Sequence, residues 1–463
     1  MHLKVKHKVS QISIHGCNIR LFSRVWLISI ILLFLLPQNA LSKDLLYYYK
    51  LAQKNDAAFQ AATHAYEASR QIKRQAIANL LPSLNADAEQ TYTYQDIKNS
   101  DSFLYREGQT HYDRTSLSLN LKQPIFNYAF FVRVRQAGEE EKVADAEFEA
   151  SRQDLMVRVV EAYLKCLITL GAIRTVMIER DAVQAFYALT REKYDRGLAG
   201  VTDMYDAEAR LNLAKAKLIE AKNLKEDAFE ALTEITKETN IEVMPFKKII
   251  PVKPHPDSVD SWVEAALKQN IRLSLQRHKV AVAEEEVKKQ YAANYPVVDF
   301  TGNVRHHESS GTEFGGGFKA NYWEAGIRFS LPLVQGGLVL SKIKEAQARY
   351  REAISMLDKE KRRVVRETRA AFLNVKTSID KIRALEAYRK SQEAALQLKQ
   401  EGYETGLYES VEVLDAQREL TRATMEYYKA CYEYVLNNIK LKQSAGILSD
   451  EDIIMVNNCL KHQ

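Results

Sequence analysis

Hydrophobic and polar residues alternate one by one in four stretches of this chain. In the first, Leu84, Ala86 and Ala88 alternate with polar side chains and lead to Tyr92 and Tyr94. The apolar members of the other three are Leu117, Leu119 and Leu121, then Val298, Phe300 and Val304, then Trp323, Ala325, Ile327, Phe329 and Leu331. Runs of roughly ten residues with aromatics toward their ends are typical of transmembrane β-strands. A half-buried strand of a soluble sheet shows the same alternation.

A polar segment separates the two strands of each predicted pair. The second segment runs from His306 to Asn321 and is rich in glycine, so we expect flexible surface loops at this end. His306 and His307 are placed in this loop as a solvated pair, because no further Cys or His stands at metal-ligand spacing.

The remaining chain has the composition of helices. Residues 44–80 contain neither Pro nor Gly and predict one helix that stops at Pro82. Residues 125–196 and 333–405 contain almost no breakers and would each reach about 100 Å as a continuous helix. Shorter helices are expected to return over 203–239 and 412–443. Small residues on the returning helices would permit close packing against the long ones, namely Ala207, Ala209, Ala214 and Ala216.

The turn between long and returning helix occurs twice, 209 residues apart. Tyr194-Asp195-Arg196-Gly197-Leu198 is followed by Asp203, and Tyr403-Glu404-Thr405-Gly406-Leu407 is followed by Glu412. Other pairs match at nearly the same offset, among them Pro124 with Pro332, Pro82 with Pro296, and Asn55 with Asn270. The chain is therefore expected to hold two structural copies, each ending in a helical hairpin tip.

These copies suggest a division of the chain. Residues 1–42 have the basic start and apolar core of a signal peptide, with Ala40-Leu41-Ser42 as the expected cleavage site and an uncleaved anchor as the alternative. We expect a first repeat over 43–240 and a linker over 241–257. A second repeat over 258–446 and a C-terminal tail over 447–463 complete the division.

Charge and cysteine content exclude several classes of protein. The 66 basic and 60 acidic residues nearly balance once the five cations of the leader are removed, which gives no argument for nucleic acid binding. Outside the leader, Cys166, Cys431 and Cys459 are odd in number and lack paired spacing, so no disulfide framework is expected. No nucleotide loop, metal spacing or nucleophile elbow is present, and we expect neither an enzyme nor a cofactor.

Four strands are too few to close a barrel in a membrane. An open sheet edge in lipid leaves backbone groups unpaired, so copies of the chain would have to pool their strands. Three copies supply twelve strands, an even number within the range of known barrels.

With these features the chain resembles the TolC family of outer-membrane channel proteins over its whole mature length. The resemblance is carried by Gly402 to Gly406, by Val411 to Ala416, and by the strand exits Phe329 to Leu333 and Gln123 to Phe126. It implies a mainly α chain with transmembrane β-strands that trimerises into a 12-stranded outer-membrane β-barrel, continued by a periplasmic α-helical barrel. It also implies an exit duct for tripartite efflux or type I secretion, with a periplasmic adaptor and an inner-membrane transporter of the RND or ABC type as partners.

The resemblance assigns roles to the hairpin tips. It implies a channel constriction at Asp203, Tyr403, Glu412 and Asp415, and adaptor contacts at Gly197, Leu198, Gly406 and Leu407. One departure is Tyr408, which stands where the best-known member has an arginine. Simpler roles also fit these residues: solvated charges for Glu412 and Asp415, hairpin packing for Tyr403, and helix C-caps for the two glycines.

An exported coiled-coil protein with a structural or adhesive role at the cell surface is the alternative function. It would account for the helices and for export. It would explain neither the four alternating strands nor the duplicated tips.

Overall fold

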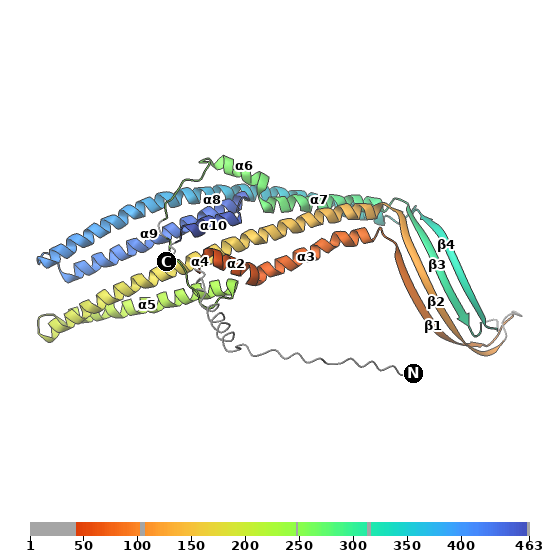
Figure 1. The fold of residues 1–463 in the computed structure, drawn as a ribbon, viewed down its shortest axis with the longest axis horizontal. Coiled ribbons are helices and arrows are strands. Elements are labelled where there is room, and N and C mark those ends of the chain that lie inside the picture. Colours follow the sequence, from red (N-terminus) through yellow and green to blue (C-terminus); the bar gives the residue numbers. More distant parts are fainter. Residues whose placement is uncertain (1–42, 102–106, 247–248, 313–315, 461–463) are drawn as a thin grey trace, which may run out of the picture. The chain divides into compact units, whose positions relative to one another are not determined.

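A computed structural model describes residues 43–101, 107–246, 249–312 and 316–460 (Figure 1). The predicted signal peptide lies outside these residues. Within them, no helix is both long and apolar enough to cross a membrane.

The order of helices and strands is the same in the two halves of the chain, which confirms the duplication. The first half contains α2 (Leu45–Asn55), α3 (Ala57–Ala78), β1 (Ser83–Ile97), β2 (Gly108–Asn127), α4 (Tyr128–Asp195) and α5 (Val201–Thr236). The second contains α6 (Val259–Gln269), α7 (Ile271–Ala292), β3 (Val297–Ser309), β4 (Phe318–Ser330), α8 (Leu338–Glu404) and α9 (Ser410–Ala445). The long helices α4 and α8 have 68 and 67 residues, as the sequence predicts.

The helix predicted over 44–80 is interrupted, and the prediction of one continuous helix is wrong. Asp56 has an extended backbone between α2 and α3, and its carboxylate accepts a hydrogen bond from the Phe59 backbone N–H at 2.7 Å. Arg158 of α4 donates two hydrogen bonds of 2.9 Å to the same carboxylate and lowers the pKa of Asp56, although burial opposes this shift. The cap and the long-range ion pair together hold the break.

A matching break occurs at Asn270 between α6 and α7. Its side chain accepts a hydrogen bond from the Leu273 backbone N–H at 3.1 Å and donates one to the Ser444 carbonyl at 2.8 Å. Asn270 lies 214 residues after Asp56, the same offset that relates Pro82 to Pro296. The structural counterpart of Asn270 is therefore Asp56, and the match to Asn55 is off by one residue.

The segment that follows α9 also forms regular structure. Gly446 ends α9 with a φ of 78°, as its C-cap position requires, and α10 (Asp450–Asn458) follows. Asp450 accepts a hydrogen bond from the Tyr49 hydroxyl at 2.7 Å, and the backbone of Leu460 bridges to Phe246. The chain after 446 thus packs against α2 and the linker.

The four strands form one antiparallel sheet in the order β1-β2-β3-β4, so β1 and β4 are its outer strands (Figure 1). Ala86, Leu119, Val304 and Trp323 are direct neighbours across it, as are Asp87, Ser118, Arg305 and Tyr322 on the opposite side. The predicted alternation therefore separates an apolar face from a polar face. The apolar face consists of Leu84, Ala86, Ala88, Leu117, Leu119, Leu121, Phe300, Val304, Trp323, Ala325, Ile327 and Phe329.

The prediction that His306 and His307 lie in a loop is wrong. His306 and His307 lie inside β3, not in a loop. His306 Nδ1 is 2.7 Å from Asn321 Oδ1 on β4, and the His307 ring packs against Phe318. Their pairing with β4 extends the second hairpin beyond the predicted strand ends.

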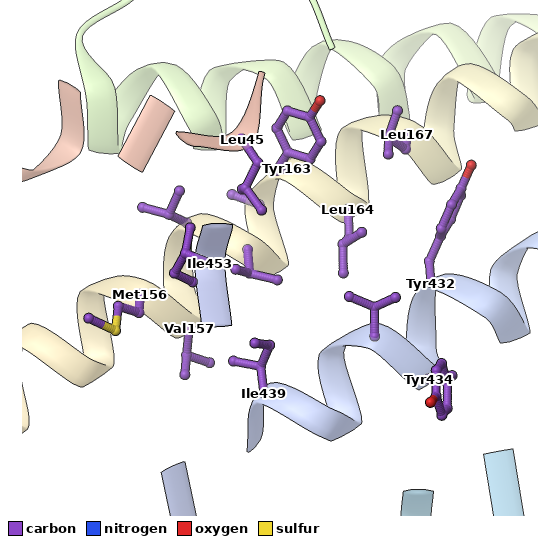
Figure 2. Packing of buried hydrophobic residues seen from close by; sticks show 14 of the residues in the cluster. Leu45, Met156, Val157, Tyr163, Leu164, Leu167, Tyr432, Tyr434, Ile439 and Ile453 are labelled. Atoms are coloured by element: carbon purple, nitrogen blue, oxygen red, sulfur yellow. The ribbon is translucent and has the colours of Figure 1, made fainter. Parts of the chain in front are cut away.

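The main hydrophobic core surrounds the middle of α4. Leu155, Val159, Tyr163 and their neighbours pack against α9, α2 and α10. Figure 2 shows Leu164 and Ile439 in the space between α4 and α9, with the Tyr163 ring turned to the other side of α4. The Tyr163 hydroxyl accepts a hydrogen bond from the Met244 N–H at 2.8 Å and so anchors the linker. This core joins the two halves of the chain, and its α4 residues lie far along the helix from both the strands and the hairpin tip.

Alanines at intervals of seven line the contacts between long and returning helices. Ala207, Ala214, Ala221 and Ala228 of α5 are buried, and so are their counterparts Ala416, Ala423 and Ala430 of α9. This spacing is that of a coiled-coil seam, and small side chains allow close approach of the helices. Of the four alanines predicted to pack, Ala209 and Ala216 are exposed instead.

Candidate functional site

The two hairpin tips have the same backbone structure. Gly197 and Gly406 follow the ends of α4 and α8 with φ of 74° and 78°. The next residue donates a hydrogen bond back into the helix, from Leu198 N–H to the Lys193 carbonyl at 2.8 Å and from Leu407 N–H to the Gly402 carbonyl at 2.7 Å. This is a Schellman motif, and its positive φ explains the glycines.

An acidic residue fixes the start of each returning helix. The Asp203 carboxylate accepts a hydrogen bond from the Gly200 N–H at 3.1 Å, and the Glu412 carboxylate accepts one from the Glu409 N–H at 3.1 Å. Negative charge in the first turn also complements the helix dipole. Asp203 and Glu412 therefore each have a structural role at the helix start. The sequence signal for this role is an acidic residue three positions after the residue that caps the helix.

Asp415 is the member of the predicted constriction that is held by ion pairs. Its Oδ1 lies 3.2 Å from Arg418 on the same helix and 3.9 Å from Arg210 on α5. Arg210 thereby connects the two hairpins. No local pattern in the sequence marks Arg210, since only the fold brings α5 close to α9.

Tyr403 and Asp203 lie on different hairpins. Tyr403 is 47% exposed, and among the described residues no hydrogen bond or ion pair joins it to Asp203. Leu198 and Leu407 are exposed to 75% and 73%, so each tip ends in an apolar side chain. The structure thus keeps the four predicted tip residues at two matching turns, and it joins Asp415 but not Tyr403 to the other hairpin.

Tyr408 packs back onto its own hairpin. A Cβ atom added at Gly402 would overlap ring carbons of Tyr408, so the ring lies over the backbone of α8 at this glycine. The corresponding residues of the first hairpin are Ala199 and Lys193, which cannot form this contact. The second tip therefore has a contact of its own, the Tyr408 clasp, which cannot be predicted from the local sequence.

A family model and several known proteins match most of this chain. The family model described as outer membrane efflux protein matches residues 48–236 and 262–447. The chain belongs to this family. It is similar to the alkaline protease secretion protein AprF of Pseudomonas aeruginosa, at 29% identity over 93% of this chain and 90% of that protein. It is also similar to the outer membrane protein TolC of Vibrio cholerae, at 28% identity over 89% of this chain and 90% of that protein.

Solved structures show the same fold. The outer membrane channel CmeC of Campylobacter jejuni superposes with a TM-score of 0.73 at 18% identity, over 90% of each chain. The outer membrane protein VceC of Vibrio cholerae does so with a TM-score of 0.70 at 19% identity, over 87% of this chain and 96% of that one.

The chain is therefore an outer-membrane channel protein of the TolC family, in the class of efflux and type I secretion channels. Membership confirms the expectation of a transport protein that is not an enzyme. It gives no support to the alternative of an exported coiled-coil protein with a structural or adhesive role.

The Tyr408 clasp predicts that the effect of Gly402→Ala on the stability of the second hairpin changes sign when Tyr408 is removed. Gly402→Ala should destabilise the second hairpin by about 1 to 3 kcal/mol, because the added methyl group collides with the ring. In a Tyr408→Ala background the same substitution should stabilise α8 by up to about 1 kcal/mol, since alanine favours helix over glycine.

Protease cleavage at residues 405–409 and amide hydrogen exchange of the hairpin measure both effects. The matched control is Lys193→Ala in the first hairpin, which should show no dependence on Tyr408. Equal effects of Gly402→Ala in both backgrounds would contradict the clasp.

Proposed function

We propose that three copies of this chain form the exit duct of a tripartite efflux pump or type I secretion system. The observation that carries the proposal is the four-stranded sheet, whose apolar face is exposed and whose outer strands each leave one edge unpaired. Trp323 and Ile327 on this face are exposed to 79% and 71%. Lipid would cover such a face, and strands of neighbouring copies would pair its edges.

The twelve pooled strands form a barrel in the outer membrane, and the helices continue it as an α-helical barrel in the periplasm. The returning helices pack on the long ones through alanines at heptad spacing, which suits a barrel of helices. Substrates enter from an inner-membrane transporter of the RND or ABC type through a periplasmic adaptor. Similarity to AprF, whose name states secretion of a protease, supports secretion as much as efflux.

The hairpin tips form the periplasmic entrance in this proposal. Asp203, Tyr403, Glu412 and Asp415 line the constriction. The exposed Leu198 and Leu407, presented by Gly197 and Gly406, contact the adaptor. Two details of the structure qualify the electrostatics: Arg210 and Arg418 offset the charge of Asp415, whereas Glu412 has no cation within ion-pair distance among the described residues. The same holds for Asp203, so Glu412 and Asp203 together carry the uncompensated negative charge of the proposed constriction.

The membrane location is tested by placing a charge on each face of the sheet. Leu119→Arg and Ile327→Arg should prevent stable insertion, because a charge facing lipid near the bilayer centre costs about 2 to 4 kcal/mol. Ser118→Arg, one residue along the same strand but on the polar face, is the matched control and should insert normally. Recovery of detergent-resistant trimers from outer-membrane fractions measures the outcome. Normal insertion of all three variants would contradict a lipid-facing apolar face.

The adaptor contact is tested at the exposed leucines. Leu198→Asp with Leu407→Asp should abolish export while the trimer still assembles, because a carboxylate cannot replace an apolar contact without a partner. Leu198→Met with Leu407→Met keeps the apolar surface and should preserve export. Site-specific crosslinking to the adaptor and export of cargo are the measurements. Wild-type crosslinking and export in the aspartate variant would remove the proposed contact.

The charge at the entrance is tested with Glu412→Gln. Glutamine can still accept the hydrogen bond from Glu409 N–H, so the substitution removes charge without removing the cap. Three carboxylates in a narrow opening attract cations, since like charges about 6 Å apart repel by about 3 kcal/mol at an effective dielectric of 20. We expect the variant to lose most of the cation selectivity in planar bilayers, whereas Glu412→Asp retains it. Unchanged reversal potentials in a salt gradient would mean that Glu412 does not line the opening.

A further inference from the structure

The interface between the two repeats of one chain is a template for the interface between two copies of the chain. Within the chain, β2 of the first repeat pairs with β3 of the second, and α4 packs against α7 and α9. Advancing every element of this interface by one repeat places β4 beside the β1 of another copy and α8 beside its α3 and α5. In the sheet, these are the strands with an unpaired edge (Figure 1).

We infer that the seam between copies reproduces the internal interface residue by residue, so that partners on β4 and β1 have residue numbers that add up to 417. The inference rests on the proposed trimer and adds the register and the contacts of its strand seam. The occupant of each open edge is a second copy of this chain. A head-to-tail contact of this kind closes into a ring.

The register follows from two offsets between the repeats. Pro82 and Pro296 relate β1 to β3 by 214 residues, and Pro124 and Pro332 relate β2 to β4 by 208. The two hairpins confirm the sum of these offsets. Partner numbers add up to 205 in the β1–β2 pair and to 627 in the β3–β4 pair, and the difference equals the two offsets together.

The alternation of side chains excludes the nearest alternative. The tip offset of 209 would match Leu119 to Arg328 and so place an apolar residue on the polar face, whereas 208 matches it to Ile327. In the β2–β3 pair the partner numbers add up to 423, as for Asn120 and Asn303. The β4 counterpart of a β2 residue has a number higher by 208, and the β1 counterpart of a β3 residue has a number lower by 214. The partner numbers of β4 and β1 therefore add up to 417.

This register brings opposite charges together on the polar face. Arg328 of β4 falls opposite Glu89 of the next copy, at the position where Asn120 and Asn303 are hydrogen-bonded inside the chain. Arg328 makes no ion pair with any described residue, because Asp299 opposite it is engaged by Lys122 at 3.2 Å. Glu89 is likewise exposed and accepts a hydrogen bond from Thr91. Both unpaired edges thus present complementary charges at the predicted contact.

The apolar face remains continuous across the same seam. Phe329 falls opposite Ala88 and Trp323 opposite Tyr94, and all four side chains point to the side that would face lipid. An aromatic pair directly opposite one another is a stabilising cross-strand arrangement. A shift by one residue would instead place Trp323 against a side chain of the polar face.

Cysteine pairs measure the register directly in the full-length protein. In a Cys459→Ser background, which removes the exposed native thiol, Glu324→Cys is combined in turn with Thr91→Cys, Thr93→Cys and Gln95→Cys. All four sites lie on the polar face. A register of 417 predicts that the pair with Thr93→Cys crosslinks between chains about tenfold faster than the others, because a shift of two residues carries the Cα atoms beyond disulfide range.

A charge reversal tests the ion pair. Glu89→Arg and Arg328→Glu should each lower the amount of detergent-resistant trimer by about fivefold, because each places like charges opposite one another. The double variant should recover the trimer, since it restores opposite charges with their positions exchanged. Absence of recovery would overturn the ion pair. Fastest crosslinking at position 91 or 95 would overturn the register, as would trimers without any crosslink. A chain that forms no trimer before any substitution would contradict the proposed function instead.

Discussion

The unpaired backbone of the outer strands is the constraint on which the rest of the architecture depends. In lipid, the N–H and C=O groups along β1 and β4 have no water to bind, and leaving them open costs several kcal/mol for each group. A single chain with four strands cannot close its sheet. The closing strands must come from other copies, so the folded unit and the functional unit differ.

Duplication offers a simple way to satisfy this constraint. A chain built from two equivalent halves already contains one finished interface, between β2 and β3 and between α4 and its neighbours α7 and α9. The same elements at the outer edges can form a second interface of the same type. This requires that strands and helices follow the same repeat order, and they do. The outer strands β1 and β4 lie in the same repeats as the helices that would meet a second copy, α3 and α5 in the first repeat and α8 in the second.

The two halves have diverged most clearly at the tips. Asp203 and Glu412 keep the same capping role, and both glycines keep the same turn. Around them the equivalence fails: Tyr408 packs on Gly402 only in the second hairpin, and Arg210 corresponds to Glu419. Exchanging the repeats would turn the attractive contact of Arg210 with Asp415 into Glu419 beside Asp206. The two hairpin tips therefore share a backbone turn but differ in their side-chain contacts.

The sequence predicted the features that depend on local pattern. Alternation identified all four strands and their two faces, and Gly197, Gly406 and Gly446 marked helix ends correctly. The break at Asp56 was missed because a helix-favouring segment is interrupted there by an ion pair with Arg158, about one hundred residues away in the sequence. Arg210, the Tyr408 clasp and the strand position of His306 depend likewise on partners that only the fold supplies.

Glu412 shows why a structural role and a channel role need not compete. The hydrogen bond from Glu409 N–H requires only an acceptor that reaches back to the N-cap, which the amide oxygen of glutamine also provides. The helix dipole adds a modest preference for negative charge, about 0.3 to 1 kcal/mol at an exposed site. Capping thus fixes the place and direction of the side chain without demanding a full charge. If a charge at this turn is functional, the cap is what holds it at a defined position in the opening, and threefold repetition converts one ordinary capping residue into a ring.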